Sequence, residues 1–372
     1  MGKRVAFRTD ASLEIGTGHV MRCLTLAETL ATHGAVCHFV CREHPGHLLD
    51  YIRKSGFVVY PLTLHDPRQL PQRKPTDTEP AHLHWLGCDW LTDAWETGEC
   101  LKALNPEWLV VDHYALDSRW EQALKERYRH LLAIDDLADR PHACDVLLDQ
   151  NLGRGAVDYA KYIPVTSIVL AGPRYALLRP EFSIVRQYSL ERRRSGQLKH
   201  LLISMGGVDR SNATVQMLKA LKTCPLPTDC KITVVMGAKA PWIEEVRAIA
   251  ATMPWSIEVR VDITDMAQVM ASSDLAIGAA GGTSWERCCV GLPTLLVVLA
   301  GNQEPAACHM GRAGVSQTLL IDQTLESRLR EFITLAVDQP EWLIDMSKKA
   351  AAVTDGNGAE RVVSVMMRTE AL

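Results

Sequence analysis

Residues 4–30, RVAFRTDASLEIGTGHVMRCLTLAETL, contain the pattern that decides the fold. Val5–Phe7 is a short apolar run, and a turn with two glycines follows it. From Val20 onward, apolar residues recur at the spacing of one face of a helix. Val36–Val40 then has the composition of a second strand. This strand–helix–strand order favours a mostly parallel sheet covered by helices.

The same alternation restarts in the second half of the chain, which predicts two α/β halves facing a cleft. We place an N-terminal Rossmann-like domain at 1–185 and a C-terminal Rossmann-like domain at 198–325. Helices are expected at 326–372, where they could pack back on the first domain. Residues 183–200 include three consecutive arginines and are interpreted as the linker. The proline-rich segment 61–80 is expected to form a surface loop or a lid.

Length and composition are those of an ordinary globular chain. The 372 residues correspond to roughly two domains of ~150 residues each. The formal net charge of −4 gives no overall basic excess, so nucleic acid is not an expected partner. The 11 cysteines are odd in number and include no CxxC pair, which favours reduced thiols over a disulfide framework or a zinc site.

Targeting signals also constrain the interpretation. The N-terminus has no apolar core of a signal peptide, because charged residues interrupt it at once. The longest apolar stretch, Cys288–Ala300, falls short of the ~20 residues that a membrane-spanning helix needs. We therefore expect a cytoplasmic protein without stable membrane insertion.

The turn after the first strand is the first candidate site. In open α/β sheets, ligands bind beyond the carboxyl ends of the strands, and glycines allow a ligand to approach the backbone. The glycine spacing does not match GxGxxG, which argues against a nicotinamide dinucleotide. His19 stands at the helix start, where an imidazole could take a proton from water near neutral pH. A capping or core-facing histidine is the alternative.

Two turns in the second half are candidate phosphate sites. Ser204–Asp209 and Gly278–Glu286 each join a strand to a helix, and such glycine-rich turns leave backbone amides free for a diphosphate. Glu286 either stabilises the helix dipole or accepts two hydrogen bonds from a ribose diol. Together these features predict a nucleoside diphosphate site, and tight turns without a ligand are the alternative.

Polar groups at other strand ends are further candidates, namely Asp112–Tyr114, Asp135–Asp136 and Asn302–Glu304. Helix capping by aspartate is an equally common reason for such positions. The sequence has neither a GxSxG elbow nor a Walker A motif, which argues against a Ser-His-Asp hydrolase and a P-loop nucleotidase.

These segments together resemble one enzyme family. Within residues 4–310 the chain is similar to the UDP-sugar hydrolases of pseudaminic acid biosynthesis, which release UDP from UDP-2,4-diacetamido-2,4,6-trideoxy-β-L-altropyranose. Residues 61–80 are not part of that family pattern, and the turn at 281–283 varies from it. The segments that carry the resemblance are Arg8–Asp10, Gly16–Arg22, Val111–Tyr114, Asp149–Asn151, Arg174–Phe182, Met205–Asp209, Trp285–Glu286 and Asn302–Gln303.

The resemblance implies a GT-B fold, like that of the glycosyltransferase that makes lipid II, and it makes His19 the catalytic histidine. It implies that Glu286 binds the ribose and that residues near Ile263 bind the uracil. The sugar-binding residues implied are Arg8, Asp10, Gly18, Arg22, Asp112, His113, Tyr114, Tyr175, Arg179, Asn302 and Gln303. The UDP-binding residues implied are Met205, Gly206, Gly207, Asp209, Ile263, Gly281, Gly282, Thr283, Ser284 and Glu286.

The expected reaction is attack of water at C1 of the sugar with inversion, which releases the free sugar and UDP. A small-molecule UDP-sugar is the expected partner, with no cofactor and no metal, and the chain is expected to be a monomer or weak oligomer. Three alternatives remain, because a fold does not separate activities: a GT-B glycosyltransferase with a UDP-sugar donor, a non-catalytic nucleotide-sugar-binding module, and a UDP-sugar 2-epimerase.

Overall fold

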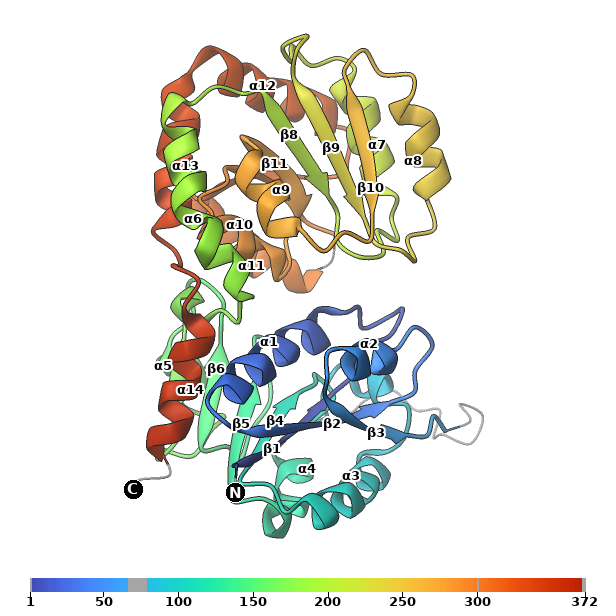
Figure 1. Cartoon of the computed structure of the whole chain (residues 1–372), viewed down its shortest axis with the longest axis vertical. Helices are drawn as coiled ribbons and strands as arrows, with labels where there is room; N and C mark the ends of the chain where they lie inside the picture. Colours follow the sequence, from blue (N-terminus) through green and yellow to red (C-terminus); the bar gives the residue numbers. More distant parts are fainter. Residues whose placement is uncertain (1, 66–78, 300, 370–372) are drawn as a thin grey trace. The chain divides into compact units, whose positions relative to one another are not determined.

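The computed structural model describes residues 2–65, 79–299 and 301–369, and the chain in it divides into two compact units. Unit 1 comprises Met1–Leu177 together with Gly358–Leu372, and unit 2 comprises Leu178–Asn357. Each unit is built on a parallel β-sheet with helices on both faces (Figure 1).

The sheet of unit 1 has seven strands in the order β3-β2-β1-β4-β5-β6-β7, and all neighbours are parallel. Successive residues of a strand point to opposite faces, so Phe7 packs with α1 and α14 while Ala6 packs with α3 and α4. The strands are β1 (Arg4–Thr9), β2 (Val36–Arg42), β3 (Val58–Leu62), β4 (Trp108–Asp112), β5 (His130–Ile134), β6 (Val146–Asp149) and β7 (Ile168–Ala171). The helices are α1 (Gly18–Thr32), α2 (Leu49–Lys54), η2 (Leu83–Leu86), α3 (Trp90–Leu104), α4 (Ser118–Ala123), η3 (Lys125–Arg127), α5 (Ala156–Tyr159), η4 (Pro173–Tyr175) and α14 (Gly358–Thr369).

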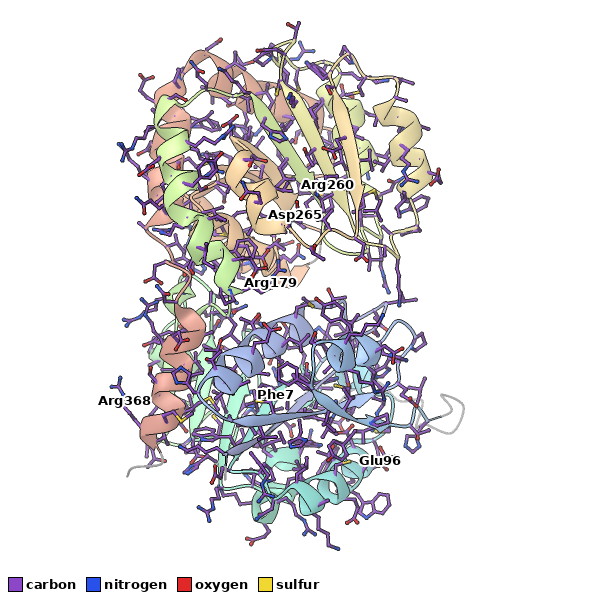
Figure 2. All side chains as sticks on the ribbon, viewed as in Figure 1. Phe7, Glu96, Arg179, Arg260, Asp265 and Arg368 are labelled. Carbon is purple, nitrogen blue, oxygen red and sulfur yellow. The ribbon has the colours of Figure 1, made fainter. Side chains whose placement is uncertain are left out.

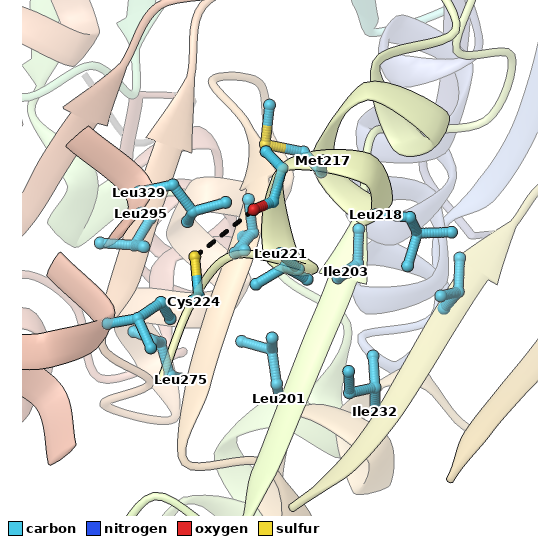
Figure 3. Packing of buried hydrophobic residues seen from close by; sticks show 14 of the residues in the cluster. Leu201, Ile203, Met217, Leu218, Leu221, Cys224, Ile232, Leu275, Leu295 and Leu329 are labelled. Atoms are coloured by element: carbon cyan, nitrogen blue, oxygen red, sulfur yellow. Dashed lines mark hydrogen bonds between the residues drawn. The ribbon is translucent and has the colours of Figure 1, made fainter. Parts of the chain in front are cut away.

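The sheet of unit 2 has six strands in the order β10-β9-β8-β11-β12-β13, again all parallel. Its core joins β8 and β11 to α7 and α12, and the thiol of Cys224 donates a hydrogen bond to the Ala220 carbonyl there (3.6 Å; Figure 3). The strands are β8 (His200–Ser204), β9 (Lys231–Met236), β10 (Ile257–Val261), β11 (Leu275–Ala279), β12 (Thr294–Val297) and β13 (Ser316–Leu319). The helices are α6 (Pro180–Arg192), η5 (Arg193–Ser195), α7 (Ala213–Leu221), α8 (Ile243–Ala250), α9 (Met266–Ser272), α10 (Thr283–Cys289), η6 (Gly301–Gln303), α11 (Glu304–Arg312), α12 (Leu325–Asp338) and α13 (Pro340–Ala351).

The segment expected to be a linker, 183–200, is largely helical. It holds most of α6 and all of η5, and both lie in unit 2. Arg186 donates to the Ala351 carbonyl (2.7 Å), and the buried Arg193 donates to the carbonyls of Val290 (2.7 Å) and Ser273 (2.6 Å). The polar composition of this segment therefore belongs to a helix whose arginines bind carbonyl groups of unit 2. The boundary between the units lies earlier in the chain, between Leu177 and Leu178.

The C-terminal helices are divided between the two units. Helices α12 and α13 belong to unit 2, whereas α14 belongs to unit 1 and packs against α1. The α14 side chains of Val362, Val363 and Met366 are buried in the core of unit 1. Among the described residues, every helix is too short or too polar to span a bilayer.

The proline-rich segment 61–80 is described only at its ends, and its residues 66–78 lie outside the described part of the chain. Pro61 belongs to β3, which is the edge strand of its sheet. An edge strand tolerates proline because one side of its backbone needs no partner strand.

Replacing Met366 with alanine tests whether α14 completes the core of unit 1. The side chain is 1% exposed, so Met366→Ala is expected to destabilise unit 1 by about 2–5 kcal/mol. Amide hydrogen exchange in urea should show faster exchange in β1 and unchanged exchange in β8. Ser364→Ala, on the exposed side of α14, is the matched control. Equal protection of β1 in both variants would contradict the prediction.

Candidate functional site

The carboxyl end of β1 leads into a group of buried charges. Arg8 and Asp10 have no exposed surface, and the Nη1 atom of Arg8 lies 2.7 Å from Oδ1 of Asp10. Arg8 and Arg42 both pair with Asp93 of α3, each at 2.7 Å. Arg42 also pairs with Glu96, which lies one turn further along α3 and is labelled in Figure 2. Arg8 and Asp10, both predicted to bind sugar, are therefore enclosed by protein in this structure.

His113 follows β4 and is fixed by this charged group. Its Nε2 atom lies 3.3 Å from Oδ2 of Asp10, and the amide of Ala115 donates to its Nδ1 atom (3.1 Å). Because Nδ1 accepts a hydrogen bond, the proton of the neutral ring sits on Nε2 and faces Asp10. Burial lowers the pKa of His113, so the ring is neutral at pH 7.

His19 lies in the first turn of α1, and its imidazole contacts the end of β4. The Nδ1 atom is 2.6 Å from Oδ1 of the fully buried Asp112. Arg22, one turn along α1, donates to both oxygens of Asp112 at 2.6 Å. Burial alone would raise the pKa of Asp112, but the charge of Arg22 overcomes it and holds that pKa far below its usual range.

An ionised Asp112 decides which nitrogen of His19 is free. The carboxylate can only accept, so Nδ1 of His19 must carry the proton that it receives. The Nε2 atom then holds the lone pair and can act as a base. Asp112 and Arg22 were predicted as sugar-binding residues, and this structure places both in contact with His19 or its partner.

Tyr114 and Asp136 complete this network. The Tyr114 hydroxyl donates to Oδ1 of Asp136 (2.5 Å), and Arg22 donates to Oδ2 of the same carboxylate (3.0 Å). The Tyr114 ring meets the His19 ring edge to face, with centroids 4.6 Å apart. Burial raises the pKa of Tyr114, so its hydroxyl keeps its proton. Sequence analysis named Asp136 only as one of several strand-end residues.

Asp149, at the end of β6, is a buried carboxyl group with a raised pKa. Burial raises its pKa to about 7. The Tyr159 hydroxyl has a single proton but lies 2.9 Å from Oδ2 of Asp149 and 3.0 Å from the Asp135 carbonyl. Both contacts are satisfied when Tyr159 donates to Asp135 and a protonated Asp149 donates to Tyr159.

Two other predicted residues of unit 1 lie outside the network. Gly18 is the first residue of α1, and a Cβ added there would meet no described atom within 4 Å. Tyr175 is half-buried in η4, with the Arg174 guanidinium 4.9 Å from its ring centroid. Gly18 has no side chain, and Tyr175 packs against the core of unit 1.

In unit 2, the turn after β8 packs against the end of β9. A Cβ added to Gly237 would lie 2.1 Å from the Gly207 carbonyl oxygen, so the two backbones touch. Gly206 has a φ of 87°, which favours glycine. Asp209 accepts hydrogen bonds from the amides of Ala213 (2.8 Å) and Thr214 (3.0 Å), and so caps α7. Met205 points its side chain into the core, which leaves only its backbone for a ligand.

The turn between β11 and α10 lies over a buried arginine. Arg287 is 2% exposed and donates to the Ala279 carbonyl (2.8 Å) and to the hydroxyls of Ser284 (3.0 Å) and Thr283 (3.1 Å). Burial lowers its pKa to about 10, so it stays charged at pH 7. Gly281 and Gly282 are exposed in the same turn, with open space where a Cβ would stand.

This buried charge makes the turn suitable for an anion, because a cation in low dielectric attracts a nearby negative group strongly. Sequence analysis did not identify Arg287. In the sequence Arg287 stands between Glu286 and Cys288–Cys289, a position that does not by itself indicate burial. Only the folded structure shows that its guanidinium turns under the glycine turn.

Glu286 lies beside Arg179, the residue that precedes α6 and is labelled in Figure 2. The Arg179 Nη2 atom is 4.0 Å from Oε1 of Glu286, and Nη1 is 2.9 Å from Oε1 of Glu181. Burial raises the pKa of Glu286, and the charge of Arg179 opposes that shift. Arg179 was predicted to bind sugar, and the structure brings it to the predicted ribose-binding residue.

The remaining predicted residues of unit 2 lie at other strand ends. Ile263 is half-buried in the connection from β10 to α9, close in sequence to the Arg260–Asp265 ion pair (2.8 Å; Figure 2). The Gln303 side chain accepts a hydrogen bond from the Leu299 amide (3.0 Å). The side chain of Asn302 lies outside the described residues.

One group of possible metal ligands occurs among the described residues. The ligand atoms of His65, Cys88 and Glu96 lie within 4.8 Å of one another. Arg42 donates to Glu96 at 2.7 Å, and burial raises the pKa of the Cys88 thiol to about 12. The Arg42 guanidinium already pairs with one of the three donors, and its positive charge disfavours a cation at this group.

Comparison with solved structures defines the class of fold. The chain matches the crystal structure of Acinetobacter baumannii MurG with a TM-score of 0.70, covering 98% of this chain and 99% of that chain at 18% identity. The protein therefore has the GT-B fold of two Rossmann-like units, as the sequence predicted.

Sequence comparison identifies the particular relatives. The chain is similar to the UDP-2,4-diacetamido-2,4,6-trideoxy-β-L-altropyranose hydrolase of Campylobacter jejuni, at 26% identity over 84% of this chain and 97% of that protein. The resemblance inferred from the sequence is thereby confirmed. An uncharacterized protein of Methanocaldococcus jannaschii is 25% identical over 82% of this chain, and the match spans 57% of that protein. Residues 205–362 match the glycosyltransferase family 28 C-terminal domain.

Asp149→Asn tests whether the Asp149 carboxyl group is protonated in the folded protein. An asparagine reproduces the protonated acid, since its Oδ1 accepts from Asn151 and its Nδ2 donates to Tyr159. Because the pKa of Asp149 is higher in the folded than in the unfolded chain, its contribution to the free energy of unfolding is complete below about pH 4. That contribution is lost as the pH rises through about 7. The unfolding free energy of the natural chain should therefore fall relative to the variant by up to about 1.4 kcal/mol per pH unit across this window.

Urea unfolding at pH 4 to 8 measures this difference. Asp50→Asn, at an exposed carboxylate on α2, is the control and should keep the pH dependence of the natural chain. Parallel curves for the natural chain and Asp149→Asn would mean that Asp149 is ionised in the folded protein.

Proposed function

We propose that this protein hydrolyses a UDP-linked diacetamido-trideoxy hexose to the free sugar and UDP. The observation that carries the proposal is the His19–Asp112 pair, in which a buried carboxylate fixes the Nδ1 proton and leaves Nε2 basic. Similarity to the Campylobacter hydrolase over most of both chains supports the substrate class.

The reaction is a single displacement at the anomeric carbon. His19 Nε2 takes a proton from a water molecule while the water oxygen bonds to C1 of the sugar. The bond from C1 to the phosphate oxygen breaks, and UDP leaves with the electron pair. Attack opposite the leaving group inverts the configuration at C1. Asp112 stabilises the imidazolium that forms, and Arg22 keeps Asp112 in place.

The UDP moiety is assigned to unit 2. The buried Arg287 and the open glycine turn at 281–282 would stabilise the charge that develops on the departing diphosphate. The turn at 206–207 would supply further amides, and Glu286 would accept the ribose hydroxyls. Ile263, beyond β10, would contact the uracil. A diphosphate is a good leaving group, so these interactions reduce the need for a general acid.

Hydrolysis in ¹⁸O-labelled water tests the proposal. The protein is incubated with UDP-2,4-diacetamido-2,4,6-trideoxy-β-L-altropyranose, and the products are followed by NMR and mass spectrometry. Inverted sugar with ¹⁸O at C1, together with unlabelled UDP, is the expected result. Label in the UDP phosphate would mean attack at phosphorus and would overturn the mechanism.

The variant His19→Asn belongs to the same experiment. It should lower the rate of UDP release by about 10²–10⁴-fold, the usual contribution of a general base, and leave UDP affinity nearly unchanged. His33→Asn, at the exposed far end of α1, is the matched control and should keep full activity. Near-normal turnover by His19→Asn would remove the histidine from the mechanism.

Glycosyl transfer is the second candidate function, because residues 205–362 match a glycosyltransferase domain. It predicts tight UDP-sugar binding without release of UDP in water alone. Addition of a hydroxyl-bearing acceptor would then start turnover. Rapid hydrolysis without any acceptor would exclude this function as the main activity.

Replacing Glu286 tests the ribose assignment. A hydrogen bond to a charged group contributes about 1.5–3 kcal/mol, so Glu286→Gln should weaken UDP binding by roughly 10–100-fold. Affinity for 2′,3′-dideoxy-UDP, measured by calorimetry, should not change. Glu181→Gln alters the other carboxylate that pairs with Arg179 and is the control. An equal loss for both ligands would place Glu286 away from the ribose.

A further inference from the structure

Four rings form a connected group around the Tyr114 side chain in unit 1. His19 meets Tyr114 edge to face, and Trp85 stacks on Tyr114 with centroids 5.6 Å apart and planes 25° apart. His82 lies 5.3 Å from Tyr114 and 4.5 Å from Trp85, between centroids. Trp85 and His82 are therefore separated from the His19 imidazole by a single ring.

Both rings come from the short segment 79–86, next to the part of the chain that the related hydrolase pattern does not contain. The segment includes η2, and Leu86 at its end is fully buried in the core. His84 pairs with Glu14 at 3.1 Å, which ties the segment to the loop between β1 and α1. These anchors place Trp85 and His82 beside that loop in a defined position.

A further contact limits how the segment can move. Gly87 follows η2 with a φ of 74°, and a Cβ there would lie 2.8 Å from His44 and 2.9 Å from Leu64. The chain is thus closely packed immediately after the aromatic residues. Trp85 itself is only half-buried, so part of its ring remains open to a ligand.

The chemistry of these rings favours an apolar ligand surface. Burial lowers the pKa of His82, so at pH 7 its ring adds no charge. Tyr114 uses its hydroxyl on Asp136 and presents ring carbon atoms to its neighbours. A sugar hydroxyl held against such carbon atoms loses water without gaining a partner, whereas the methyl of an acetamido group gains from burial.

We propose that Trp85, supported by His82 and Tyr114, binds the acetamido groups of the sugar and makes the site selective for acetamido sugars. The inference rests on the proposed function, because it places a sugar at His19. It goes further by assigning sugar selectivity to residues 79–86.

Binding measurements in the His19→Asn background test the inference without turnover. Calorimetry compares UDP with UDP-2,4-diacetamido-2,4,6-trideoxy-β-L-altropyranose and with UDP-glucose. The diacetamido sugar should bind about ten-fold more tightly than UDP alone, and UDP-glucose should show no such gain. Adding Trp85→Ala should abolish the gain in affinity and leave UDP affinity unchanged. Amide hydrogen exchange in β1 should match that of the parent, which shows that unit 1 of the variant is folded. Trp85→Phe, which keeps an aromatic face, should retain most of the gain in affinity.

Trp95→Ala is the matched control, because Trp95 is 69% exposed on α3. An unchanged ratio of affinities in Trp85→Ala, or no gain in its parent, would overturn the inference. The result is separate from that for hydrolysis. A protein that fails to release UDP but loses acetamido selectivity in Trp85→Ala keeps the inference and loses the proposed reaction. A protein that hydrolyses the substrate with unchanged selectivity keeps the reaction and loses the inference.

Discussion

Buried charge is the constraint on which unit 1 depends. Arg8, Asp10 and Asp93 have no exposed surface, and each is balanced by an opposite charge within 2.7 Å. Removing one partner from such a group costs several kcal/mol, because the remaining charge stays buried without compensation. The group therefore fixes the ends of β1 and β2 relative to α3. His113 is oriented by the same group, and the loop that leads to His19 begins at its edge.

A second group of charges applies the same constraint closer to the chemistry. Asp112 is buried at the end of β4 and is compensated by Arg22 from α1. The strand and the helix are thereby locked together, and His19 takes its orientation from that pairing. Asp136, which follows β5, joins this group by accepting hydrogen bonds from Arg22 and Tyr114. One arginine thus links the helix to two carboxylates from neighbouring strands.

Much of this arrangement follows from sequence periodicity. Parallel strands bring their carboxyl ends to one edge, so a histidine after β1 and an aspartate ending β4 can be expected to meet. The choice of partners cannot be read in the same way. Asp209, predicted to bind UDP, accepts hydrogen bonds from two amides at the start of α7, and its position between β8 and α7 does not reveal this contact. Arg287 escaped notice because its burial depends on packing, which has no local signature.

Secondary structure shows the same division. The apolar run Val36–Val40, predicted as a strand, lies in β2, whereas β6 and the half-polar β13 (SQTL) were not predicted. The arginine-rich segment at 183–200 was interpreted as a linker, because the carbonyl groups that Arg186 and Arg193 bind lie about 80 or more residues away in the sequence. The contact between Trp85 and Tyr114 could not be predicted, because Trp85 lies in η2, Tyr114 follows β4, and the whole of α3 separates them in the sequence.

The return of α14 to unit 1 has a consequence for synthesis on the ribosome. All of unit 2 lies between residues 178 and 357, so it is translated before α14. Unit 1 begins first but lacks Val362, Val363 and Met366 until the end of the chain emerges. The unit that starts later can therefore finish folding earlier. The apolar surface of unit 1 that α14 covers stays exposed until then, and nascent-chain chaperones would have most to protect there.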